Sequence, residues 1–264
     1  MLFNGYIDES YGPDRNLFTW CCLIARWKDW GEMERQWKLH LKAKNKDLAK
    51  AGRPAFSRYH ASDCSSRHGE FEGWTHSERD AFVIGLFGIF KRVPTHTCVY
   101  DMQLDELCEV FPEWAGDRLE AAYTLNTMFL LYLIGNDFKK HSQGRQPRIN
   151  LFHDQTASNG KYDPTILRTF NTQINRPDFI YRDYFTKIAS MRWQQCIPLQ
   201  PADLVAFENY KEVQAKMEAR RSRKSFEALI NMEEFGIHSK TFQKQALIEM
   251  RESMIKEGLT IHRN

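Results

Sequence analysis

Strand-like and helix-like segments alternate along most of this chain, and this alternation limits the fold more than any single motif does. Residues 2–9 and 17–26 are rich in aromatic and β-favouring residues, and residues 11–16 have turn composition, so a hairpin is predicted. The remaining predicted strands are 56–60, 96–102, 148–154 and 184–190. The predicted helices are 28–50, 77–91, 117–139, 163–174, one that begins at Pro201, and 239–257, which Gly258 closes. This order predicts an α/β fold.

The length of 264 residues suits one large domain. No repeat of fixed period and no linker-like tract divides the sequence. We therefore expect one α/β domain over residues 1–218 and a helical C-terminal extension over 219–264 that packs on the same domain.

Composition excludes several classes of protein. With 42% hydrophobic and 27% charged residues, the chain is neither collagenous nor wholly disordered. The longest apolar stretch, Met128–Gly135, is far shorter than the roughly 20 residues of a spanning helix, so we expect a buried core helix there. The six cysteines include no CxxC pair, and no basic stretch followed by an apolar run opens the sequence, so we expect a cytoplasmic protein. The net charge of +3 is too small to identify a nucleic-acid ligand by itself.

Three aspartates stand where predicted strands end or a predicted helix begins. Asp8 lies in or just after the first strand, Asp154 ends a later strand, and Asp203 falls in the first turn of the helix that begins at Pro201. In α/β proteins such ends converge on one crevice, so the three aspartates are candidates for one site. Alternation along a strand puts Asp8 and Glu9 on opposite faces, so we expect at most one of them to point into a site while the other faces solvent. We assign Asp8 to the site and keep Glu9 as a further candidate.

Carboxylates gathered in one place favour a cation. The neighbours of Asp203 are apolar on both sides, which indicates a buried charge that needs a partner such as a metal ion. Crowded carboxylates repel one another unless a cation lies among them. Mg²⁺ and Mn²⁺ prefer oxygen ligands, and two such ions about 3.5 to 4 Å apart can assist hydrolysis of a phosphodiester. Either ion is therefore the expected cofactor.

Four segments together resemble a known family. They are YIDES at 6–10, YHASD at 59–63, the strand that ends on Asp154, and LQPADLVAF at 199–207, of which the last is the most specific. They resemble the family called domain of unknown function 3800, which is regarded as RNase H-like, over most of residues 3–210. The resemblance implies an RNase H-like mixed sheet begun by an N-terminal hairpin, continued by parallel strands and flanked by helices, with carboxylates at a metal site.

The resemblance also implies roles for individual acids. Asp8 matches the acid of the first strand in RNase H-like enzymes, and Asp203 matches the acid on the final core helix. For the intermediate acid, Asp154 is the first choice and Asp101 the second.

The glutamate that such enzymes usually carry on the first long crossing helix has no convincing match in this sequence. Glu78 is a candidate for it, and His60 and Asp63 are possible substitutes. His60 is also expected to line the site.

The leading hypothesis for function is a divalent-metal-dependent nuclease or related phosphodiesterase. Asp8, Asp154 and Asp203 would hold the metal, and metal-activated water would attack phosphate. The alternative is a catalytically inactive RNase H-like module, either nucleic-acid-binding or accessory to a mobile-element or defence system, which the missing helix glutamate favours. The expected partner is RNA, DNA or a hybrid of the two.

A basic run near the C-terminus has two interpretations. Arg220, Arg221, Arg223 and Lys224 could contact phosphates, or they could form the solvated face of a charged helix.

Overall fold

The computed structural model of the chain describes residues 1–12, 16–90, 93, 95–141, 146–156, 160–192, 194, 196–231 and 236–256. In this part of the chain, six strands form one mixed sheet in the order β5-β4-β1-β2-β3-β6. The strands are β1 (Leu2–Tyr11), β2 (Leu17–Arg26), β3 (His96–Gln103), β4 (Arg148–Asp154), β5 (Phe185–Met191) and β6 (Gly236–Phe242). The α/β class with a mixed sheet is therefore confirmed.

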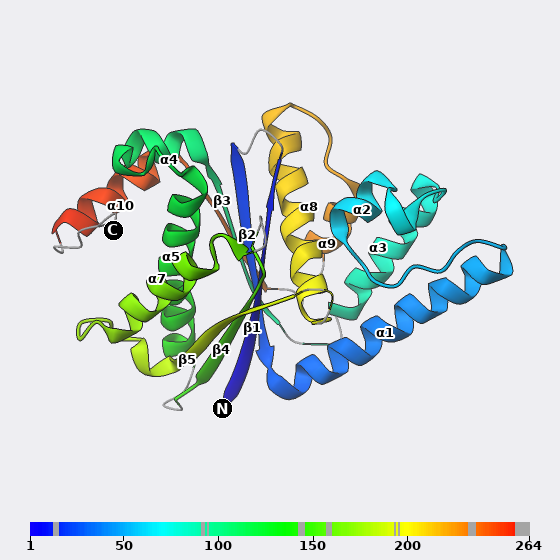
Figure 1. Cartoon of the computed structure of the whole chain (residues 1–264), viewed down its shortest axis with the longest axis horizontal. Helices are drawn as coiled ribbons and strands as arrows, with labels where there is room; N and C mark the ends of the chain where they lie inside the picture. Colours follow the sequence, from blue (N-terminus) through cyan, green and yellow to red (C-terminus); the bar gives the residue numbers. More distant parts are fainter. Residues whose placement is uncertain are drawn as a thin grey trace.

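Helices cover both faces of the sheet, which Figure 1 shows nearly edge-on between them. One face carries α1 (Trp27–Lys50), α2 (Ala61–Ser66), α3 (His76–Phe90), α8 (Leu199–Met217) and α9 (Lys224–Ile230). The other face carries α4 (Leu104–Val110), α5 (Arg118–His141), α7 (Asp163–Asn175) and α10 (Lys244–Lys256). Short 3₁₀ turns occupy Gly69–Phe71, Pro112–Trp114 and Arg182–Tyr184. The molecule therefore has three layers.

The predicted hairpin is confirmed. β1 and β2 run antiparallel with Ile7 opposite Cys22, and β3 continues antiparallel on the far side of β2. On the other side of the hairpin, β4 runs parallel to β1 and β5 runs parallel to β4. Residues 13–15 of the expected turn lie outside the described residues. Because β1 and β4 are parallel neighbours, their carboxyl ends meet at one edge of the sheet.

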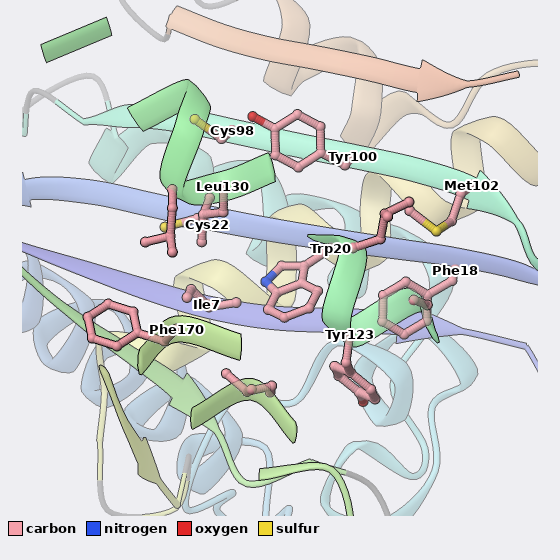
Figure 2. Close-up of a cluster of buried hydrophobic side chains, with 14 of the residues drawn as sticks. Ile7, Phe18, Trp20, Cys22, Cys98, Tyr100, Met102, Tyr123, Leu130 and Phe170 are labelled. Atoms are coloured by element: carbon pink, nitrogen blue, oxygen red, sulfur yellow. The ribbon is translucent and has the colours of Figure 1, made fainter. Parts of the chain in front are cut away.

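Side chains alternate between two cores along β1. Tyr6 belongs to the core under α8, whereas Ile7 belongs to the core under α5. Figure 2 shows part of the second core, where Trp20 and Phe18 of β2 lie against Tyr123 of α5. By the same alternation, Asp8 faces α8.

The longest apolar stretch lies within α5, as predicted. Leu130, Leu131 and Ile134 are buried in the core that Figure 2 shows. None of the described helices combines the length and the apolar character that a membrane crossing needs.

The strand predicted at 56–60 is wrong. The side-chain amide of Asn45 in α1 donates to the Phe56 carbonyl at 2.8 Å and accepts from the Phe56 N–H at 3.0 Å. Gln200 of α8 accepts from the Tyr59 N–H at 3.2 Å. Two polar side chains therefore take the hydrogen bonds that a neighbouring strand would have taken.

The prediction of one helix over 239–257 is also wrong in its first part. Residues 236–242 form β6, which pairs in parallel with the outer edge of β3, with Cys98 opposite His238. α10 begins only at Lys244, and the expected helix end at Gly258 lies outside the described residues. The C-terminal region thus adds a sixth strand to the central sheet as well as the helices α9 and α10.

Candidate functional site

A pocket of about 360 Å³ lies where β1 and β4 end and α8 begins. Its lining residues come from segments far apart in the sequence: Asp8, Glu9, Ser10, Tyr11, His60, Ser62, Asp154, Gln155, Gln200, Asp203 and Phe207. They include Asp8, Asp154 and Asp203, the three predicted metal ligands, together with the further candidates Glu9 and His60. The volume is in the range of small-ligand pockets.

Asp8 and Asp154 are neighbours across two parallel strands. Ile7 of β1 pairs with His153 of β4, and an aspartate follows each of them. Tyr6 stacks on Phe152 at 5.3 Å between ring centroids, so the two strands present matching positions to the same face. Asp8 is only 8% exposed, and its Oδ1 accepts the N–H of Glu9 at 2.8 Å.

Asp203 joins the pocket from the first turns of α8. Its Oδ2 accepts the backbone N–H of Ala61 at 2.7 Å, and Ala61 opens α2. His60 precedes that helix, and Asp63 lies 2.8 Å from its Nδ1. Together with the hydrogen bond from the Tyr59 N–H to Gln200, this bond joins the segments 59–63 and 199–207, and Asp63 orients His60 from outside the pocket lining.

Glu9 reaches the pocket from the opposite face of β1. Its Oε1 accepts the hydroxyl of Tyr123 at 2.6 Å, and the Tyr123 ring stacks on Tyr162 with 4.9 Å between centroids. Asp8 and Glu9 therefore face different helices, as alternation predicts. Both line the pocket, so the expectation that one of them faces solvent is wrong, because the Tyr123 hydroxyl holds the Glu9 carboxylate at the pocket.

The loop after β4 is held by Asp163. Its Oδ1 accepts from the N–H and the hydroxyl of Thr156, at 3.0 and 2.9 Å, and its Oδ2 accepts from the Ser190 hydroxyl at 2.7 Å. α7 begins at Asp163 itself, with Tyr162 at the capping position. The Asp163 side chain therefore fixes the chain beside Asp154 rather than capping α7.

The electrostatics of the pocket disfavour ionisation of its acids. Burial raises the pKa of Asp8 well above its usual range, and the neighbouring Asp203, Glu9 and Asp154 raise it further. Burial raises the pKa of Glu9 to about 7, although the Tyr123 hydroxyl opposes that rise. Burial also raises the pKa of Asp203, while His60 lowers it. Such a group of acids must bind protons or a cation at neutral pH.

Asp101 does not line this pocket. It is 2% exposed; Thr19 donates its hydroxyl to Oδ1 at 2.6 Å, and Asn209 donates its amide to both oxygens at 2.8 Å. Burial raises its pKa to about 6, and these two partners oppose the rise. Of the two candidates for the intermediate acid, Asp154 is the one in the pocket.

Glu78 lies outside the pocket and stabilises the start of α3. Its Oε2 accepts the N–H of Thr75 at 2.8 Å, its own N–H donates to the Thr75 hydroxyl at 3.1 Å, and Arg53 donates to Oε1 at 2.7 Å. The hydrogen bond from the Thr75 N–H, with help from Arg53, lowers its pKa to about 2. The spacing Thr75-x-x-Glu78 is a capping box, a signal already present in the sequence. The fourth acid of the pocket is Glu9.

Sequence reasoning missed several lining residues: Ser10, Tyr11, Ser62, Gln155, Gln200 and Phe207. A usable signal existed for Gln200, because it stands three residues before Asp203 and therefore shares its helix face.

The donors of the pocket suit Mg²⁺ or Mn²⁺, because carboxylate oxygens are the ligands these ions prefer. Across the described ranges, however, no three His, Cys, Asp or Glu side chains stand grouped so that they could hold a metal ion. Asp8, Asp154 and Asp203 would have to turn toward a common point to do so.

Neither a protein-family model nor a curated protein sequence matches the chain. The proposed function therefore rests on the geometry of the pocket.

Proposed function

We propose that this chain is a divalent-metal-dependent phosphodiester hydrolase that cleaves nucleic acid. The observation that carries the proposal is the pocket itself, which Asp8, Asp154 and Asp203 line from three separate elements, with Asp8 almost fully buried among like charges. A purely structural cluster of this kind would destabilise the fold. A cation bound among these carboxylates would offset their mutual repulsion.

The proposal includes an RNase H-like fold and membership of the domain of unknown function 3800 family. A sheet that begins with a hairpin, continues in parallel strands and carries helices on both faces is in keeping with that fold. The segments 6–10, 59–63 and 199–207 and the end of β4 all contribute to one pocket. These are the segments on which the resemblance rests.

In this mechanism Asp8, Asp154 and Asp203 would hold Mg²⁺ or Mn²⁺. When bound, such ions activate water and stabilise the leaving oxygen of a phosphodiester. Glu9 adds a fourth carboxylate, which the Tyr123 hydroxyl holds in place. Asp63 orients the His60 ring at the pocket wall.

Cations beside the acidic pocket support a nucleic-acid substrate. Phe207 lines the pocket, and the Arg223 guanidinium and the Lys211 ammonium lie 5.5 and 5.6 Å from its ring centroid. Arg220 and Arg221 are exposed in the segment that joins α8 to α9. These two arginines therefore lie on a connection and not on a helix face. Arg220 pairs with Glu218 at 2.7 Å, and both arginines are exposed enough to contact phosphates.

The experiment is a cleavage assay with Mg²⁺ or Mn²⁺ on fluorescein-labelled single-stranded RNA, single-stranded DNA, DNA duplex and RNA–DNA hybrid. Metal-dependent cleavage of at least one substrate is expected. Asp8→Asn and Asp154→Asn should each lower the rate by about 10³-fold or more, because each removes an anionic ligand. Asp101→Asn is the matched control, since Asp101 is a buried aspartate outside the pocket, and its rate should stay near that of wild type. Equal rates for the three variants would contradict the proposal.

The second candidate function is a catalytically inactive module that binds nucleic acid. The lack of a three-ligand group among the described residues favours it, as does the position of Glu78 outside the pocket. Binding of the same oligonucleotides with no metal-dependent cleavage, and with no metal-induced rise in melting temperature, would select this function.

A further inference from the structure

Gln200 is a buried pocket residue that the mechanism above leaves without a role. It is the second residue of α8, is 3% exposed and lines the pocket. Asp203 follows three residues later, so the two side chains leave the same face of the helix.

The orientation of the Gln200 amide is fixed by two donors. Its Oε1 accepts the indole N–H of Trp37 at 2.9 Å and the backbone N–H of Tyr59 at 3.2 Å. An amide nitrogen could accept neither bond, so chemistry settles which end of the amide is oxygen. Trp37 is itself fully buried, which makes this anchor rigid.

The Nε2 end of the Gln200 amide is available to a ligand in the pocket. Its Nε2 carries two N–H donors, and within the described part of the chain neither has a hydrogen-bond acceptor. Nε2 is also not among the side-chain atoms that are sealed from solvent without a partner. Because Gln200 lines the pocket, its donors open into that space.

We infer that Gln200 is a substrate-binding residue whose Nε2 amide donates a hydrogen bond to a non-bridging oxygen of a phosphate group. This inference rests on the proposed function and names a contact of that site. A phosphodiester brings anionic oxygens into a pocket where Asp8, Glu9, Asp154 and Asp203 would repel them, so a fixed neutral donor such as the Gln200 amide favours binding. A lysine or arginine there would pair with the carboxylates and compete with a metal ion. A neutral amide in a fixed position binds the phosphate without that competition.

The direct test uses dimethyl phosphate with Mg²⁺ and ¹⁵N–¹H spectra of the wild-type protein. The Gln200 side-chain amide signal is assigned as the one missing from Gln200→Glu. Saturating dimethyl phosphate should move one of its proton signals downfield, because a hydrogen bond to an anionic oxygen deshields the proton. Binding of dimethyl phosphate that leaves this signal in place would overturn the inference, and so would no binding at all.

The second test compares Gln200→Glu with Gln155→Glu. The first variant keeps an oxygen for Trp37 and Tyr59 and replaces the donor by an acceptor. The second adds the same charge to the same pocket at a glutamine whose Oε1 accepts from Arg192, so it measures the effect of charge alone. With bis(4-nitrophenyl) phosphate and Mn²⁺, KM for Gln200→Glu should exceed that of Gln155→Glu by about 10- to 100-fold, the usual cost of losing a hydrogen bond to a charged group.

The outcomes separate this inference from the proposed function. If dimethyl phosphate moves the Gln200 amide signal but no phosphodiester is hydrolysed, the hydrolase proposal fails and the amide–phosphate hydrogen bond stands. If hydrolysis occurs while the amide signal stays in place and both variants have equal KM, that hydrogen bond is wrong and the hydrolase stands. If Gln200→Glu does not fold, the amide is assigned by specific labelling, and the wild-type spectra decide.

Discussion

Two buried aspartates on the same face of the sheet have opposite surroundings. Asp101, between β3 and α8, accepts hydrogen bonds from Thr19 and Asn209, both neutral donors. Asp8, at the end of β1, accepts from the N–H of its neighbour Glu9 and has acids around it. The one is 2% exposed and the other 8%, so burial alone does not distinguish them.

The two carboxylates differ in the groups that surround them. The donors around Asp101 complete its hydrogen bonding within the protein, which suits a structural role. Around Asp8 the neighbours add negative charge, so what is missing is a positive charge. A strand-end aspartate with like charges around it is therefore a better candidate for metal binding than one with neutral donors.

The largest expected effect is that Asp101→Ala and Asp8→Asn change the free energy of unfolding in opposite directions. Asp101→Ala removes the acceptor of one buried amide and one buried hydroxyl, so it should lower the free energy of unfolding by about 2 to 4 kcal/mol. Asp8→Asn keeps an oxygen for the Glu9 N–H and removes a repelled charge. It should raise the metal-free free energy of unfolding at pH 8, because the neutral amide is not repelled by the neighbouring acids. Urea denaturation measures both, and two changes of the same sign would contradict the comparison.

The next effect concerns metal binding by Asp203. At a metal concentration about 100 times the dissociation constant, wild type should gain about 2.7 kcal/mol of stability, and Asp203→Asn should lose most of that gain. The asparagine keeps an oxygen for the Ala61 N–H, so the fold should persist.

Thermal melts with and without Mg²⁺ or Mn²⁺ measure this gain. Glu78→Gln is the control, because Glu78 lies outside the pocket and caps α3. That variant should melt earlier than wild type yet show the full metal-induced rise. An equal rise in Asp203→Asn and wild type would exclude the ligand role.

A smaller effect is the pH dependence that Glu9 adds. Its folded pKa of about 7 lies above the ordinary value of 4.5, so the folded state binds the proton more tightly than the unfolded state. The stability it contributes is complete below about pH 4.5 and is lost as the pH rises through about 7, with a total of roughly 3 kcal/mol. Glu9→Gln keeps an acceptor for Tyr123 and should flatten the metal-free stability curve over that window. Denaturation midpoints from pH 4 to 8 provide the measurement. If the stability of Glu9→Gln and of wild type changes equally with pH, the pKa of Glu9 is not raised.

Local patterns in the sequence were enough for the hairpin and for the strand ends that carry Asp8 and Asp154. Alternation also placed Asp8 and Glu9 on different faces. Local patterns failed where contacts between distant parts of the chain determine the structure. β6 forms because β3 offers a free edge about 140 residues earlier, and Phe56 stays out of the sheet because Asn45 takes its backbone groups. No local pattern contains either partner.

The residues of the pocket were predictable to a similar extent. Its aspartates follow from strand and helix ends, whereas the Tyr123 hydroxyl that holds Glu9 comes from the second turn of α5, among buried apolar residues. Glu78 has the residue type of the expected helix glutamate, but its spacing from Thr75 assigns it to the capping box of α3. Capping is a local interaction and could have been identified from the sequence.

The smallest expected effect tests whether the basic segment around the connection from α8 to α9 also binds phosphates. Arg220, Arg221 and Lys224 are exposed, whereas Arg223 pairs with the buried Glu208 at 3.2 Å and must be kept to avoid an uncompensated charge. Neutralising the three exposed cations to Gln should flatten the dependence of log affinity on log salt by roughly 0.7 to 0.9 for each phosphate that these side chains neutralise. Neutralising Lys139, Lys140 and Lys256, exposed cations of α5 and α10 on the other face, provides the matched control and should leave the slope unchanged. Metal-induced stabilisation should be equal in both triple variants, because neither set belongs to the pocket lining. Equal slopes for the two variants on single-stranded, duplex and hybrid ligands would mean that phosphate binding is confined to the pocket.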